Sequence, residues 1–206
     1  MSELSSVIAM VSQVRDGFKP IREQADLYLA THPGEEGLGF AHELYASDRY
    51  QARMMATIML GRLSARHPEA FHTLRTAVAQ DSDWRTQEML AMAFDMYCKD
   101  SGYEETLPVI RDWLTDPNHN VRRAVSEGLR IWTHRPYFKE HPGVAIELLA
   151  SLKNDDHEYV RKSAGNALRD ISRFHKDLVA KELQAWDLTD KRIADTYQYA
   201  ARFVAK

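Results

Sequence analysis

The feature that most constrains the fold is one stretch of helical sequence that occurs four times. Aligned by their apolar residues, the copies read ARMMATIML from Ala52, TQEMLAMAF from Thr86, VRRAVSEGL from Val121 and VRKSAGNAL from Val160. Their starts are 34, 35 and 39 residues apart. Each copy follows an Asp-containing turn and precedes a second helical stretch, so the chain is expected to repeat a pair of helices.

The rest of the sequence also favours helices. Apolar residues recur at the helical period, and no stretch shows the two-residue alternation of a half-buried strand. Three short amphipathic helices are expected before residue 48. Further helices are expected over about 49–66, 68–80, 83–98, 104–114, 118–132, 142–152, 157–174, 176–186 and 190–204. The sequence therefore predicts an all-α, HEAT-like repeat solenoid with a concave polar groove, built as a single domain over residues 1–206. A helical bundle with accidental internal similarity is the alternative.

Charge is distributed unevenly along the chain. The net charge is −3, but residues 1–48 hold eight acidic and three basic residues. The basic excess is concentrated in the two most similar copies, NHNVRRAVSEGLRIWTHR from Asn118 and EYVRKSAGNALRD from Glu158. Binding partners are therefore better inferred from this local patch than from the overall charge.

The cysteine count and the hydropathy pattern narrow the class further. One cysteine, Cys98, excludes an intramolecular disulfide and any paired-cysteine zinc or redox motif. No His/Cys cluster has the spacing of metal ligands, so neither a metal nor another cofactor is expected. No signal pattern begins the sequence, and no apolar run approaches the roughly 20 residues of a membrane span. We expect a cytoplasmic protein with no membrane partner.

The repeat register places polar residues together. Equivalent positions of neighbouring repeats lie side by side on a helical array, and residues four apart share a helix face. The third and seventh positions of the last three copies are Glu88 and Met92, Arg123 and Glu127, and Lys162 and Asn166, with Asp170 one turn further. The polar residues of this set are expected to form one strip of carboxylates among cations across three neighbouring helices, namely Glu88, Arg123, Glu127, Lys162, Asn166 and Asp170. Ordinary surface ion pairs, such as Arg123 with Glu127, are the alternative.

At these residues the chain resembles the DNA alkylation repair family of HEAT-like glycosylases, in its AlkC and AlkD branches. The resemblance extends over about residues 83–186 and is strongest in VRRAVSEGLR and EYVRKSAGNALRDIS. It implies a repair enzyme that removes positively charged N3- and N7-alkylated purines by hydrolysing the N-glycosidic bond. It also implies a cationic groove that binds double-stranded DNA.

The resemblance carries candidate catalytic residues onto this chain. Glu127, in SEG, matches an acidic active-site residue of the AlkC branch, and Asp170, in RDIS, matches a carboxylate of that branch's NDIS motif. Glu88 is similar to its third acid. Trp84 and Glu88 also reproduce the spacing of a Trp and an Asp that carry catalysis in the AlkD branch, with Glu in place of Asp.

Two positions qualify this match. Arg123 resembles an arginine that lies beside the lesion in the AlkD branch, whereas Asn166 stands where that branch has a second tryptophan. The AlkC motif continues SEG-R-P-x-L-P-W, whereas this chain reads SEGLRIWTHRPYF. The binding pocket is therefore expected to differ from both branches.

The residue types suit this chemistry. A cationic alkylated base is a good leaving group, so the protein need only stabilise the positive sugar with a carboxylate and position a water. Trp84 and Asn166 are expected to contact the substrate. Basic side chains would bind phosphates without reading sequence, namely Arg122, Arg123, Arg130, Arg161, Lys162, Arg169 and Arg173. A monomeric glycosylase is the main hypothesis. The alternative is a HEAT-repeat scaffold without catalysis that binds DNA or a protein through the same groove.

Overall fold

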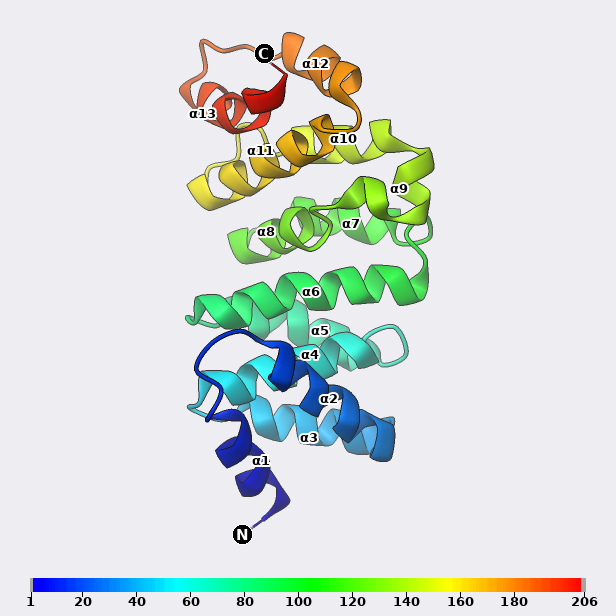
Figure 1. The fold of residues 1–206 in the computed structure, drawn as a ribbon, viewed down its shortest axis with the longest axis vertical. Coiled ribbons are helices and arrows are strands. Elements are labelled where there is room, and N and C mark those ends of the chain that lie inside the picture. Colours follow the sequence, from blue (N-terminus) through cyan, green and yellow to red (C-terminus); the bar gives the residue numbers. More distant parts are fainter. Residues whose placement is uncertain (1, 205–206) are drawn as a thin grey trace. The chain divides into compact units, whose positions relative to one another are not determined.

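The computed structural model describes residues 2–204, and every regular element in that range is a helix (Figure 1). The prediction of an all-α protein is confirmed. No helix of the described residues is long and apolar enough to cross a membrane. The chain divides into two compact units, Met1–Asp100 and Ser101–Lys206, which are described separately. Whether the whole chain forms one domain stays a prediction.

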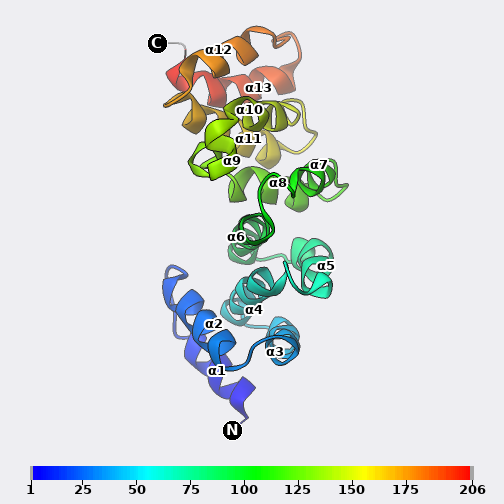
Figure 2. The same cartoon turned by 90° about the vertical axis from the view of Figure 1, so that its right-hand side faces the viewer.

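The first unit is built around one buried helix. Its elements are α1 (Glu3–Val11), α2 (Lys19–Thr31), α3 (Glu35–Tyr45), α4 (Tyr50–Leu63), α5 (Pro68–Thr76), the 3-10 turn η1 (Val78–Gln80) and α6 (Trp84–Ser101). Helix α4 packs against α2, α3 and α5 (Figure 2), and apolar side chains on all of its faces are buried. A Cβ atom at Gly61 would lie 2.7 Å from the Ala93 Cβ atom. The glycine therefore permits the close approach of α6 to α4.

The second unit has the same organisation around α11. Its elements are α7 (Leu107–Leu114), α8 (His119–Gly128), η2 (Trp132–His134), α9 (Pro136–Glu140), α10 (Pro142–Ala150), α11 (Glu158–Ser172), α12 (Lys176–Gln184), α13 (Lys191–Ala200) and η3 (Ala201–Phe203). Helix α11 packs against α8 and against α13 (Figure 1). At Gly165, a Cβ atom would lie 2.7 Å from the Tyr199 Cβ and 2.8 Å from the Thr196 carbonyl oxygen. Only glycine fits this crossing without a shift of α13.

The helix expected over 118–132 is shorter than predicted. It ends at Gly128, and Leu129 has the non-helical angles φ −98° and ψ 25°. Glycine is unfavourable in the interior of a helix. After Gly128 the chain turns, so that Trp132 is fully buried and packs against Phe138 with ring centroids 4.6 Å apart. Tertiary packing of the tryptophan therefore overrides the local helical pattern. The short helix α9, which starts at Pro136, was also not predicted.

The arginine at the second repeat position binds the turn before its own helix. In α4, Arg53 Nη1 donates to the carbonyl oxygens of Ser47 and Asp48, each at 3.1 Å. Its Nε donates to Asp81 Oδ2 at 2.7 Å, which belongs to the turn before the next copy. One guanidinium thus joins two consecutive turns, an arrangement that we call a turn clamp.

The second unit repeats the turn clamp. Arg122 Nη1 donates to the carbonyl oxygens of Asp116 and Pro117 at 2.8 and 3.2 Å, and its Nε and Nη2 hold the carboxylate of Asp155. Arg161 Nη1 donates to the Asp155 carbonyl oxygen at 2.7 Å. The repeat inferred from the sequence therefore has a structural basis in these shared contacts.

Candidate nucleic-acid interface

The most highly charged part of the candidate site surrounds Asp170 on α11. Arg130 Nε donates to Asp170 Oδ2 at 3.0 Å, and Arg169 Nη2 donates to Oδ1 at 3.0 Å. Arg173 Nε lies 4.0 Å from the same oxygen. Three guanidiniums therefore converge on one carboxylate whose side chain is only 25% exposed. We call Arg130, Arg169, Asp170 and Arg173 the Asp170 cluster.

The packing of α8 on α11 positions this cluster. The buried hydroxyls of Ser126 and Ser163 form a hydrogen bond of 2.6 Å between the two helices. Small side chains at both positions bring the helices close, so that Arg130, just after α8, reaches Asp170. Arg169 is oriented further by a bond of 2.9 Å from its Nη1 to Asn166 Oδ1.

Glu127 lies at the edge of the Asp170 cluster. Its Oε2 atom is 3.7 Å from Arg130 Nη1, so that Arg130 lies between two carboxylates from two helices. In the second unit, the structure thus brings together Glu127, Asn166 and Asp170 with three of the predicted phosphate contacts. The three guanidiniums outnumber the two carboxylates, so the cluster retains a net positive charge.

Arg123 and Lys162 occupy the third repeat position on α8 and α11. Arg123 is half-buried and Lys162 is exposed. Neither side chain has an ion-pair partner among residues 2–204, so both cations remain available to an external anion. Their role in binding DNA stays a prediction.

The expected phosphate contacts Arg122 and Arg161 need correction. Both are about nine-tenths buried. The guanidinium of Arg122 is occupied by Asp155, by Asp156 at 2.7 Å and by two carbonyl groups. The hydrogen bond to Asp155 is the main cause of a raised Arg122 pKa, although burial opposes it. Because Arg122 serves the turn clamp, and Arg161 is buried with its Nη1 bonded to the turn before α11, these two arginines are removed from the proposed DNA surface.

Trp84 and Glu88 lie in the first unit, at the start of α6. Trp84 is 59% exposed, and the guanidinium of Arg85 lies over its ring, 4.7 Å from the centroid. Glu88 is exposed one turn further along the helix. An exposed indole beside a cation is available for stacking on a sugar or base. The convergence of Glu88 with Glu127 and Asp170 on one surface stays a prediction.

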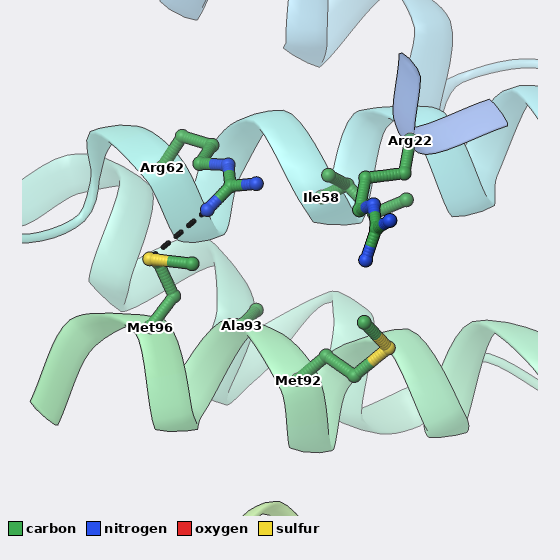
Figure 3. Close-up of a pocket in the computed structure, with 6 residues that line it drawn as sticks. All are labelled: Arg22, Ile58, Arg62, Met92, Ala93 and Met96. Atoms are coloured by element: carbon green, nitrogen blue, oxygen red, sulfur yellow. Dashed lines mark hydrogen bonds between the residues drawn. The ribbon is translucent and has the colours of Figure 1, made fainter. Parts of the chain in front are cut away.

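A small cavity in the first unit lies among α2, α4 and α6 (Figure 3). It measures about 30 Å³ and has an apolar floor that includes Ile58 and Met92, the seventh-position residues of the first two copies. Arg62 lines it and donates from Nη1 to Met96 Sδ at 3.1 Å. The polar row of the second unit is therefore replaced by apolar residues here, and a cavity of this size holds about one water molecule.

A family model and two solved structures match nearly the whole chain. The family model described as DNA alkylation repair enzyme matches residues 10–203. The solved structure of AlkD2 from Streptococcus mutans is 45% identical, with 98% of each chain covered and a TM-score of 0.96. A second structure, smu.31 from Streptococcus mutans UA159, is 44% identical over 98% of this chain and 100% of that chain, with a TM-score of 0.92.

Two further similarities are more limited. The alkylpurine DNA glycosylase AlkC of Pseudomonas fluorescens, solved bound to DNA with an abasic site analog, has a TM-score of 0.52. At 23% identity, over 98% of this chain and 62% of AlkC, it supports the fold alone. The uncharacterized protein YhaZ of Bacillus subtilis (strain 168) is 36% identical over 87 residues, which are 40% of this chain and 24% of YhaZ. The family model and the AlkD2 structure confirm the predicted helical repeat architecture and the resemblance seen in the sequence. The chain therefore belongs to the DNA alkylation repair enzyme family.

Proposed function

We propose that this protein binds double-stranded DNA during the repair of alkylated bases, with the Asp170 cluster in contact with the phosphate backbone. The observation that carries this proposal is the convergence of Arg130, Arg169 and Arg173 on one carboxylate. Arg173 and Arg130 are 57% and 40% exposed, so they can donate to phosphate oxygens while Asp170 holds their positions.

Binding of this kind depends on counterion release. Each guanidinium that neutralises a phosphate releases condensed cations, so the affinity falls linearly with salt on a logarithmic scale, with a slope of about −0.9 per phosphate contact. Contacts to the backbone carry no direct sequence information. We therefore expect binding that is steeply salt-dependent and independent of sequence.

A titration of labelled duplex DNA at several salt concentrations tests this proposal. We expect Arg173→Gln to weaken binding to all sequences and to reduce the salt slope by about 1. Arg192→Gln is the matched control, because Arg192 is about equally exposed but lies at the N-terminal end of α13. A flat salt response, or an equal effect of both variants, would refute the proposed surface.

The more specific activity that we propose is excision of N3- or N7-alkylated purines. The alkylated base carries its own positive charge and leaves without a strong acid. Glu127 and Asp170 are the carboxylates that pair with Arg130, and either can stabilise the positive sugar that remains or bind the attacking water. The proposal requires no metal or other cofactor.

Recognition of DNA without excision is the second candidate. It is favoured by the contacts of Asp170, because both of its carboxylate oxygens already accept hydrogen bonds from Arg130 and Arg169 and so have less capacity left to bind a water. Release of 3-methyladenine or 7-methylguanine from methylated duplex DNA decides between the two. Release by the wild-type protein supports the glycosylase. Binding without release over many hours supports recognition alone.

A further inference from the structure

A phenylalanine that the sequence analysis did not single out lies at the end of α11. Phe174 follows the last helical residues, and its side chain is 67% exposed. Its only ring contact among the described residues is with His134, edge to face, with centroids 5.5 Å apart. Most of the Phe174 side chain therefore remains open to a ligand.

Phe174 belongs to a small exposed apolar edge. Ile131, in the segment after α8, is 51% exposed, and the amide of His134 donates to its carbonyl oxygen at 2.9 Å. We call Ile131, His134 and Phe174 the apolar edge. Single exposed apolar residues are common on protein surfaces, but a group of them beside charged residues marks an interaction site.

The apolar edge adjoins the Asp170 cluster along both segments. Phe174 directly follows Arg173 and lies one turn after Asp170, and Ile131 directly follows Arg130. Arg130 and Asp170 are joined by a hydrogen bond of 3.0 Å. The exposed ring is thus held next to guanidiniums that favour an anionic ligand.

Guanidiniums that bind phosphates, next to an exposed aromatic ring, are the combination that recognises unpaired nucleotides. The cations bind the backbone and the ring stacks on a base. In an intact duplex both faces of every base are covered by its neighbours, so the ring has nothing to stack on. A base that is bulged out or unpaired presents a free face. The net positive charge of the cluster would also attract an acidic peptide, but such a ligand would leave the aromatic ring unused.

We infer that Phe174 stacks on an unpaired base and that the protein prefers DNA with a locally unpaired base over intact duplex. This inference rests on the proposed DNA-binding function, because the Asp170 cluster must bring the backbone to the ring. The ring of His134 packs against Phe174 at an interplanar angle of 62°, and two-thirds of the Phe174 side chain stays exposed. The preference follows from stacking and is therefore tolerant of base identity.

The test compares two duplexes of the same sequence that differ by one bulged 2-aminopurine. We expect the wild-type protein to bind the bulged duplex about tenfold more tightly, because one base–aromatic stack contributes about 1–3 kcal/mol and about 1.4 kcal/mol corresponds to a factor of ten. Stacking of the 2-aminopurine should also quench its fluorescence. Phe174→Ala should abolish both the preference and the quenching, and Phe174→Trp should restore them.

Tyr159→Ala is the matched control. Tyr159 is an aromatic residue on the same helix, 63% exposed, but at the end of α11 remote from Asp170. It should leave the preference unchanged. Circular dichroism melts establish that each variant is folded.

The outcomes separate this inference from the proposed function. Equal binding of both duplexes by the wild-type protein, with Phe174→Ala without effect, overturns the role of Phe174 and leaves DNA binding intact. Equal weakening of both duplexes by Phe174→Ala also overturns it, because the ring would then not select unpaired bases. Failure of the wild-type protein to bind either duplex at low salt refutes both proposals.

Discussion

Arg122 and Asp155 meet through two parallel hydrogen bonds, from Nε to Oδ2 at 2.7 Å and from Nη2 to Oδ1 at 2.8 Å. Burial alone would raise the pKa of Asp155. Hydrogen bonds from Arg122 and from the backbone N–H of His157, together with the charge of Arg122, outweigh burial and lower it. The carboxylate is therefore charged at neutral pH and depends on Arg122 for compensation.

Removing the guanidinium should destabilise the fold strongly. For Arg122→Ala we expect the free energy of unfolding to fall by about 3–5 kcal/mol, because a buried carboxylate loses its cation. Urea denaturation measures the change. Arg111→Ala is the control, since Arg111 forms an exposed ion pair with Glu147 and its loss should cost about 1 kcal/mol or less. Similar losses in both variants would contradict the structural role of Arg122.

A second prediction about stability concerns the crossing of α11 and α13. Gly165→Ala places a methyl group 2.7 Å from the Tyr199 Cβ atom, so we expect a loss of about 1–3 kcal/mol. Gly143→Ala in α10 meets no atom within 4 Å and should be neutral or slightly stabilising, because alanine favours a helix. Thermal melts of the two variants compare them directly. A neutral Gly165→Ala would mean that α13 moves away without cost.

Stability should decrease as the pH falls through the range of histidine titration. The pKa of His119 is lowered from 6.5 by burial and by the charges of His157 and Arg122, although Asp155 and Asp156 oppose this. The unfolded chain then binds the proton more tightly than the folded one, so stability is full above about pH 6.5 and is lost as the pH falls from there toward the lowered folded pKa. The ring stacks on His157 with centroids 3.7 Å apart.

His119→Phe keeps the stack and removes the titrating group. Between pH 8 and pH 5 its unfolding free energy should fall less than that of the wild-type protein. Denaturation at a series of pH values measures both slopes. Identical slopes would exclude His119 as a contributor.

Tryptophan fluorescence should report on the start of α6. Trp113, Trp132 and Trp186 are buried, whereas Trp84 is 59% exposed. Acrylamide should therefore quench mainly Trp84, and Trp84→Phe should remove most of the quenchable emission. If Trp84 contacts the substrate, as the sequence leads us to expect, saturating DNA should protect the wild-type emission. Unchanged quenching in the variant would place the exposed tryptophan elsewhere.

Asp170→Asn should separate binding from excision. The amide keeps the shape but removes a negative charge beside three arginines, so DNA binding should be retained or become tighter at low salt. If Asp170 stabilises the positive sugar, excision should fall about 100-fold or more. Parallel binding and base-release assays on methylated duplex measure the two effects. Weaker binding together with unchanged excision would contradict both assigned roles.

Much of the fold could be predicted because helical periodicity and repeat spacing are local properties of the sequence. The same pattern could not tell an arginine in a turn clamp from one that faces solvent. Arg122 and Arg123 are adjacent cations, yet one is nine-tenths buried and the other is half-buried without an ion-pair partner among residues 2–204. The difference depends on Asp155, which is 33 residues away in sequence.

Repeat spacing also allowed part of the candidate site to be predicted. Register placed Glu127 and Asp170 on neighbouring helices, and the structure joins both to Arg130. The exposure of Phe174 could not be foreseen, since an aromatic residue at the end of an apolar helix face is usually buried. One signal was available: Phe174 directly follows an arginine where the helix ends.

The turn clamp also determines where this chain can be cut. In α6 the arginine position is Gln87, whose amide nitrogen donates to the carbonyl oxygens of Val78 and Asp81 in its own unit. Gln87 is uncharged and has no carboxylate partner in the described part of the chain. A division of the chain after Asp100 therefore separates no ion pair at this position. Division between Arg122 and Asp155, by contrast, would leave each of these residues without its charged partner. Exchange of segments among relatives should therefore be tolerated better after Asp100 than between Arg122 and Asp155.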